Sequence, residues 1–137
     1  MPRIVLCLML LLAATSTGIE AQNEPQTGFM VHQLLICPAP NMAEVDRLSA
    51  LTAPILDELR QEGMIRAWYD LRHSWGDEWN VSVVTVADSH RAWLDFWSEY
   101  LRRVTARQPS LFSEFLALCT LHKDNMYAIR DSRTGDN

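Results

Sequence analysis

The side chains best suited to chemistry in this sequence are imidazole, phenol and amide groups that lie within apolar, strand-like segments. His32 is in the middle of the apolar segment 29–37, where an inward-facing imidazole needs a hydrogen-bonding partner. Tyr69 and His73 are four residues apart in a second such segment, and Asn80 begins a third. Because alternate residues of a strand share one face, these groups can point into a common space. The predicted ligand-binding residues are His32, Tyr69, His73 and Asn80.

Each of these residues also has a purely structural interpretation. His32 can be a hydrogen-bonded core histidine, His73 an exposed strand end, and Asn80 a hydrogen-bonding group in a subunit interface. Two further histidines are expected at the surface, His90 in the first turn of a helix and His122 in a turn before the last strand. The catalytic residues are therefore unknown at this stage, and the sequence leaves open whether the protein is an enzyme.

No metal or cofactor motif is present in the sequence. It contains no His-x-His, no His-Glu-x-x-His and no Cys-x-x-Cys, which are common metal-ligand spacings. It also lacks Gly-x-Ser-x-Gly and a phosphate-binding glycine loop. We predict no metal and no cofactor; the alternative is a haem or a metal held by His32, His73 and an acid such as Asp70.

Composition and charge narrow the class of protein. The 137 residues are 48% hydrophobic and 21% charged, which predicts a packed domain and not a disordered chain. The formal net charge is −5 and the basic residues are scattered, so binding to nucleic acid is not expected.

The N-terminus has the order of a secretory signal peptide. Arg3 precedes an apolar run of about eleven residues, which is too short to span a bilayer, and small residues follow it. We predict a signal peptide over 1–21, a leader over 22–28, one domain over 29–130 and a polar tail over 131–137. The mature protein would be periplasmic or extracellular, without membrane contact. It keeps two cysteines, Cys37 and Cys119, and an even count in an exported domain favours a disulfide.

Hydrophobic periodicity predicts an α+β domain. Apolar, β-branched segments predict strands at 29–37, 64–73, 79–86 and 126–130, with the turn 74–78 joining the second and third. Helical spacing predicts a helix from Asn41 to Gly63, a second from Asp88 or Ser89, and a short third after Pro109. Asn41 and Glu44 form a predicted capping box, and Pro54 should kink the first helix or start a segment capped by Thr52.

The order strand, helix, strand, strand, helix, short helix, strand is that of a ferredoxin-like split β-α-β fold. Right-handed crossovers place the first strand between the third and fourth in a four-stranded antiparallel sheet, with the second strand at an edge. The start of the fourth strand then lies near the end of the first. This topology brings Cys119 within reach of Cys37, and the two are the predicted disulfide.

The first and third strands are apolar on both faces, so a second sheet from a partner subunit is expected to cover the open face. Together with the Trp75-Gly76-Asp77 hairpin and the aromatic helix after Asp88, this pattern resembles the dimeric α+β barrel superfamily. The resemblance implies a homodimer, with Trp75 in the interface or over a pocket. Its members suggest three functions: binding a small, partly apolar ligand in the barrel lumen, an oxygenase-like or haem-handling enzyme, or a structural and interaction module. Fold alone does not choose among them.

Overall fold

The computed structural model describes residues 27–76 and 78–131. The predicted signal peptide, most of the predicted leader and the tail after Asp131 lie outside these residues, so their assignment stays a prediction. Within the described residues, no helix is both long enough and apolar enough to cross a bilayer.

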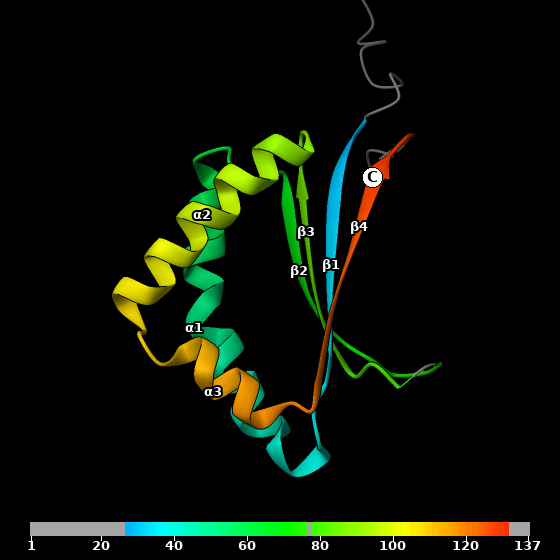
Figure 1. The fold of residues 1–137 in the computed structure, drawn as a ribbon, viewed down its shortest axis with the longest axis vertical. Helices are drawn as coiled ribbons and strands as arrows, with labels where there is room; N and C mark the ends of the chain where they lie inside the picture. The colour runs from blue at the N-terminus through cyan, green and yellow to red at the C-terminus, as the bar shows by residue number, and fades with distance from the viewer. Residues whose placement is uncertain (1–26, 77, 132–137) are drawn as a thin grey trace, which may run out of the picture.

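Four strands and three α-helices make up the described chain (Figure 1). In chain order they are β1 (Gly28–Ile36), a 3-10 turn (Ala39–Asn41), α1 (Met42–Gln61), β2 (Ala67–Arg72), β3 (Val81–Ala87), α2 (His90–Arg107), α3 (Leu111–Leu118) and β4 (Leu121–Ile129). The sheet order is β2-β3-β1-β4 and every pair is antiparallel. The predicted ferredoxin-like α+β fold, with its short extra helix before the last strand, is confirmed.

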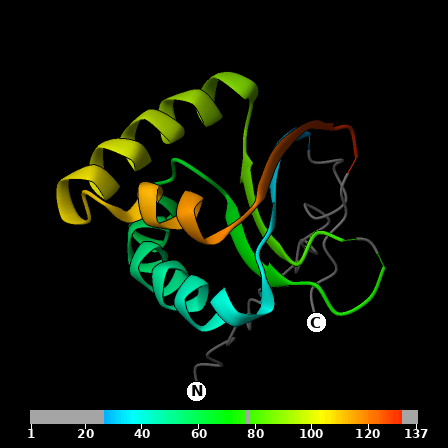
Figure 2. The same cartoon turned by 60° about the horizontal axis from the view of Figure 1, so that its bottom comes forward.

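The helices form one layer against one face of the sheet (Figure 2). The indole Nε1 of Trp93 on α2 donates to Oγ1 of Thr85 at 2.9 Å, which identifies the face of β3 that carries Thr85 as the helix-covered face. Val31 is paired with Thr85 across the sheet and is fully buried with Phe96 and Leu48 between the two layers. Burial of these apolar side chains between sheet and helices is the main stabilising contribution.

Two details of the first helix differ from the prediction. Pro54 lies inside α1 without ending it, and the Thr52 hydroxyl donates to the Ser49 carbonyl at 2.9 Å instead of capping a new segment. Buried residues on both sides of Pro54 hold the helix against the sheet, so tertiary packing outweighs the lost backbone hydrogen bond. Asn41 makes no capping bond; its amide donates to the Leu118 carbonyl at 2.7 Å and ties the start of α1 to the end of α3.

The last strand begins five residues earlier than predicted. β4 pairs with β1 from Leu121 opposite Ile36 to Ile129 opposite Gly28. The segment 122–125 is polar and was expected in a turn, but an edge strand tolerates polar residues because its outer side faces water. His122 therefore lies in a strand, and this correction matters for the site below.

Cys37, which follows β1, and Cys119, which follows α3, are joined by a disulfide, the pairing expected from the topology. Cys37 is 1% exposed. The Asn80 side chain accepts from the Cys37 amide at 2.8 Å and donates to its carbonyl at 2.6 Å. The disulfide and Asn80 together fix the end of β1 to the helix layer and to the start of β3.

Arginines of α2 join α1 to α2 through carboxylates. Arg103 donates to Glu62 at 2.6 Å and to Glu99 at 2.7 Å, and Arg107 donates to Glu58 at 2.7 Å. Hydrogen bonds from Arg102 and Arg103 lower the pKa of Glu99 to about 2 from its ordinary 4.5. A carboxyl whose pKa is lowered by folding stabilises the native state above pH 4.5, and this contribution is lost as the pH falls toward 2.

Acid unfolding should depend on Arg103. We expect Arg103→Gln to flatten the loss of stability between pH 4.5 and 2, because the variant has less carboxylate stabilisation to lose. Urea unfolding at a series of pH values measures this slope. Arg91→Gln is the matched control, since the Arg91–Asp95 pair lies on the outer side of the same helix with its side chains 84% and 56% exposed. Equal slopes in wild type and Arg103→Gln would contradict the expectation.

Candidate functional site

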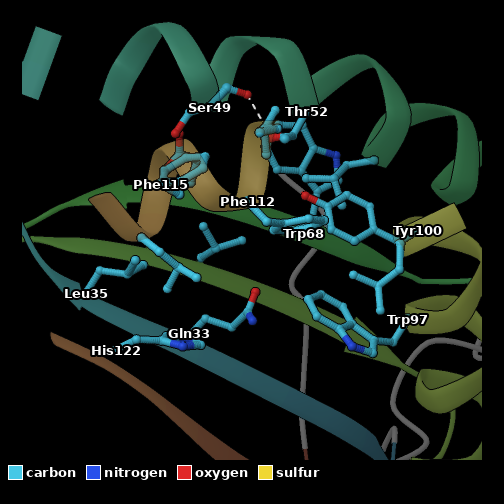
Figure 3. A pocket seen from close by; sticks show the side chains of 16 residues that line it. Gln33, Leu35, Ser49, Thr52, Trp68, Trp97, Tyr100, Phe112, Phe115 and His122 are labelled. Carbon is cyan, nitrogen blue, oxygen red and sulfur yellow. Dashed lines mark hydrogen bonds between the residues drawn. The ribbon is translucent and has the colours of Figure 1, made fainter. Parts of the chain in front are cut away.

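A cavity of about 270 Å³ lies between the helix-covered face of the sheet and the three helices. Its walls are mainly aromatic and aliphatic (Figure 3). The aromatic lining residues are Trp68, Trp97, Tyr100, Phe112 and Phe115. A concave, mostly apolar space of this kind, with a few polar groups, is the usual form of a small-molecule site.

Strand alternation and helical spacing bring these side chains together. Gln33 and Leu35 are two residues apart on β1 and therefore point to the same side of the sheet, as Trp68 and Asp70 do on β2. From the helix layer, side chains of α2 and α3 reach toward them (Figure 3). Ser49 and Thr52 of α1 are small, and their size leaves room where larger residues would fill the core.

Three rings of the aromatic wall, those of Trp97, Tyr100 and Phe112, belong to a row that begins at the core residue Trp93. The ring centroids of Trp93 and Trp97 are 5.5 Å apart and those of Trp97 and Tyr100 are 5.4 Å apart, both stacked. Phe112 meets Tyr100 edge-on at 6.2 Å. Such contacts hold the rings in defined positions and make the wall rigid.

Tyr100 carries a hydroxyl into this wall. Burial raises its pKa to about 12, and a hydrogen bond with Thr52 opposes the shift only in part. The phenol is therefore neutral at any physiological pH. It contributes a polar contact to the wall but not a charge.

The polar lining residues on the sheet side of the cavity are Gln33 of β1, Asp70 of β2 and His122 of β4, and those of β1 and β4 are linked through Asp124. Nε2 of His122 lies 2.9 Å from Oδ1 of Asp124, and the Gln33 amide donates to the same oxygen at 3.3 Å. His122 lines the cavity with a side chain that is 41% exposed, and Leu116 of α3 also lines it while 66% exposed. The cavity therefore opens to solvent between α3 and β4.

The four residues predicted to bind a ligand do not line this cavity. His32 and Tyr69 lie on the opposite face of the sheet, where His32 is hydrogen-bonded to Ser82. His73 follows β2 close to Gly76, and Asn80 holds the backbone of Cys37. The structure thus does not bring the four together at the cavity, and ligand binding by these residues stays a prediction about the open face.

Sequence reasoning missed the polar side of the cavity. The sequence did contain a signal for a strand here, because His122 and Asp124 are alternate residues and can share one face, as Gln33 and Leu35 do in β1. The assignment of residues 122–125 to a turn hid this signal.

Trp97 was expected in the core; the structure places it in the part of the core that faces the cavity. Among residues 27–76 and 78–131, no three histidine, cysteine, aspartate or glutamate side chains cluster as metal ligands would.

The face of the sheet away from the helices is uncovered by the described chain and carries apolar side chains beside the polar His32, Ser82, Lys123 and Asn125. Alternation places Tyr69, Leu71, Leu121 and Tyr127 on it, and each is 46% to 56% exposed. Half-buried Met30, Leu34 and Ile36 lie between them on β1. Trp75, in the β2–β3 connection, is 92% exposed.

Comparison with known proteins shows a similarity of fold to solved structures and no match at the level of sequence. No protein-family profile and no curated protein sequence matches the chain. Three solved structures do match, and they show a resemblance of fold to ferredoxin-like proteins, two of which are described as dimeric.

One of these structures is a mutant of SnoaB, a cofactor-independent oxygenase from Streptomyces nogalater. It is 19% identical, with a TM-score of 0.52 over 78% of this chain and 96% of that one. The others are two dimeric ferredoxin-like proteins from an uncultured marine organism. Each is 14% identical with a TM-score of 0.55 over 80% of this chain, and the match covers 94% and 99% of their lengths.

Proposed function

We propose that this protein is an exported homodimer that binds a small, mainly apolar molecule in the cavity of each protomer. The observation that carries the proposal is the aromatic-walled cavity of about 270 Å³. An apolar cavity of about 150 Å³ holds benzene, so by volume this one accommodates roughly ten non-hydrogen atoms. That is the size of two fused rings.

The uncovered sheet face supports the homodimer. Exposed apolar side chains of the edge strands β2 and β4, with the half-buried ones of β1 between them, form a surface that a monomer would leave in water. A second copy presents the same patch and covers it by two-fold symmetry. The structural neighbours that are described as dimeric have the same fold, which favours this arrangement.

Export rests on the predicted signal peptide and on the disulfide. Disulfides such as Cys37–Cys119 persist mainly in oxidising compartments, which fits a periplasmic or extracellular protein.

Native mass spectrometry of the purified protein, followed by its denatured intact mass, tests the proposal directly. The expected result is a dimer with the added mass of one or two small molecules, at most one in each protomer. This added mass should be lost on denaturation. A protein that is monomeric, without added mass and unable to bind any apolar probe of one or two rings, would overturn the proposal. It would instead favour a structural or interaction module.

A cofactor-independent oxygenase is the second candidate function. It is favoured by the likeness to SnoaB and by an imidazole, that of His122, beside a mainly apolar cavity. The retained molecule, incubated with the protein under ¹⁸O₂, should then gain labelled oxygen. A molecule that is recovered unchanged would leave binding as the function.

The size of residue 83 should set the size of the ligand. Val83 points from β3 into the cavity, so Val83→Phe would displace about four ligand atoms worth about 0.3 kcal/mol each, a loss of about eightfold in affinity. Val83→Ala should instead admit larger probes. Titration with one-, two- and three-ring hydrocarbons measures both effects. Leu94→Phe adds a ring on the exposed side of α2 and should change neither the affinity nor the size of the probes that bind. Unchanged binding in Val83→Phe would show that the ligand binds outside this cavity.

A further inference from the structure

The polar cluster at the cavity mouth consists of His122, Asp124 and Gln33. His122 and Asp124 are alternate residues of β4, and they pair with Leu35 and Gln33 of β1. All four side chains therefore point to the helix-covered side, whereas Lys123 points to the other side. Figure 3 shows His122 and Gln33 next to each other on the sheet side of the cavity.

The hydrogen bonds of this cluster define which of its atoms remain for a ligand. An ionised carboxylate only accepts, so Asp124 receives the hydrogen of His122 Nε2 and one from the Gln33 amide. A neutral His122 with its hydrogen on Nε2 has a lone pair on Nδ1. In the described part of the chain Nδ1 of His122 and Oε1 of Gln33 have no hydrogen-bonding partner; Oε1 is an acceptor, and Nδ1 is one in this neutral tautomer.

The other polar groups named around the cavity are already paired. The Asp70 carboxylate forms an ion pair with Arg72. The Trp68 indole donates a hydrogen bond to Asp57, and the Tyr100 hydroxyl is hydrogen-bonded to Thr52. The unpaired hydrogen-bond acceptors are therefore those at the mouth between α3 and β4. A ligand that matches this arrangement has an apolar body and a hydrogen-bond donor at the end that remains near solvent.

We infer that His122, oriented by Asp124, accepts a hydrogen bond from a hydroxyl group of the cavity ligand. The ligand class is thus an alcohol or phenol on an apolar framework of about two rings. The inference rests on the proposed function, since it assigns the polar contact of that same cavity. Asp124 is a positioning residue that fixes the imidazole and does not itself contact the hydroxyl.

Two probes of equal shape test the inference: naphthalene and 2-naphthol, each titrated into the oxidised full-length mature protein by calorimetry or tryptophan fluorescence. One net hydrogen bond is worth about 1 kcal/mol, so the wild type should bind 2-naphthol about fivefold more tightly. His122→Phe should remove this preference and leave naphthalene binding in place. Asp124→Asn should reduce it, because the amide no longer fixes the Nε2–H tautomer. Lys123→Ala, on the opposite face of the same strand, is the matched control and should keep it.

Each outcome has a distinct meaning. If neither probe binds the wild type, both the proposed function and this inference are overturned. If both probes bind equally, the cavity function stands and the hydroxyl assignment fails. A preference that persists in His122→Phe would exclude His122 as its source. Thermal unfolding of each variant verifies that it is folded. If a variant does not fold, the comparison of naphthalene with 2-naphthol on the wild type still tests the ligand class.

Discussion

Replacing Cys37 and Cys119 together by alanine should lower the free energy of unfolding by about 4 kcal/mol. The disulfide spans 82 residues, and a cross-link of that length removes a large part of the chain entropy of the unfolded state. Its loss is a large fraction of the 5–15 kcal/mol that stabilises a typical domain. Urea unfolding of the oxidised wild type and of the double variant measures the difference.

The controls separate the cross-link from the side chains. Wild type with its disulfide reduced should resemble the double variant, and each single alanine variant should resemble both. A difference below about 1 kcal/mol would show that packing around Asn80 and the end of β1 suffices without the covalent bond. The α3 wall of the cavity is anchored by this disulfide, so ligand affinity should fall in parallel with stability.

Placing a charge on the open sheet face should dissociate the proposed dimer. We expect Leu71→Asp combined with Tyr127→Asp to weaken dimerisation at least about a thousandfold, because symmetry places both carboxylates twice in an interface whose exposed side chains are mainly apolar. Sedimentation velocity over a concentration series measures the dissociation constant. The unfolding free energy of the monomer should change little, since both side chains are about half exposed in the single chain.

Leu94→Asp is the matched control for this experiment. Leu94 is 42% exposed on the outer side of α2, so its replacement adds a charge at similar exposure away from the sheet. The cavity is lined by residues of one protomer, and the monomeric variant should therefore still bind its ligand. A wild type that sediments as a monomer, or a double variant that remains dimeric, would contradict the proposed interface.

The sequence by itself determined the order and type of the elements. Local signals were sufficient for this: helical spacing from Val45 to Leu59, the Ser89 cap of α2 that accepts from the Ala92 amide, and the β-branched segment that becomes β3. Handedness rules then gave the strand order, and the strand order brought Cys37 near Cys119.

Only the tertiary structure decided where the site lies. Alternation shows that Gln33 and Leu35 share a face, but the pattern of β1 is apolar on both faces and does not say which one the helices cover. The polar segment with His122 and Asp124 has weak strand propensity, and it becomes β4 only because the long-range pairing with β1 supplies its hydrogen bonds. The cavity itself is a volume left between side chains of seven elements, which no local pattern encodes.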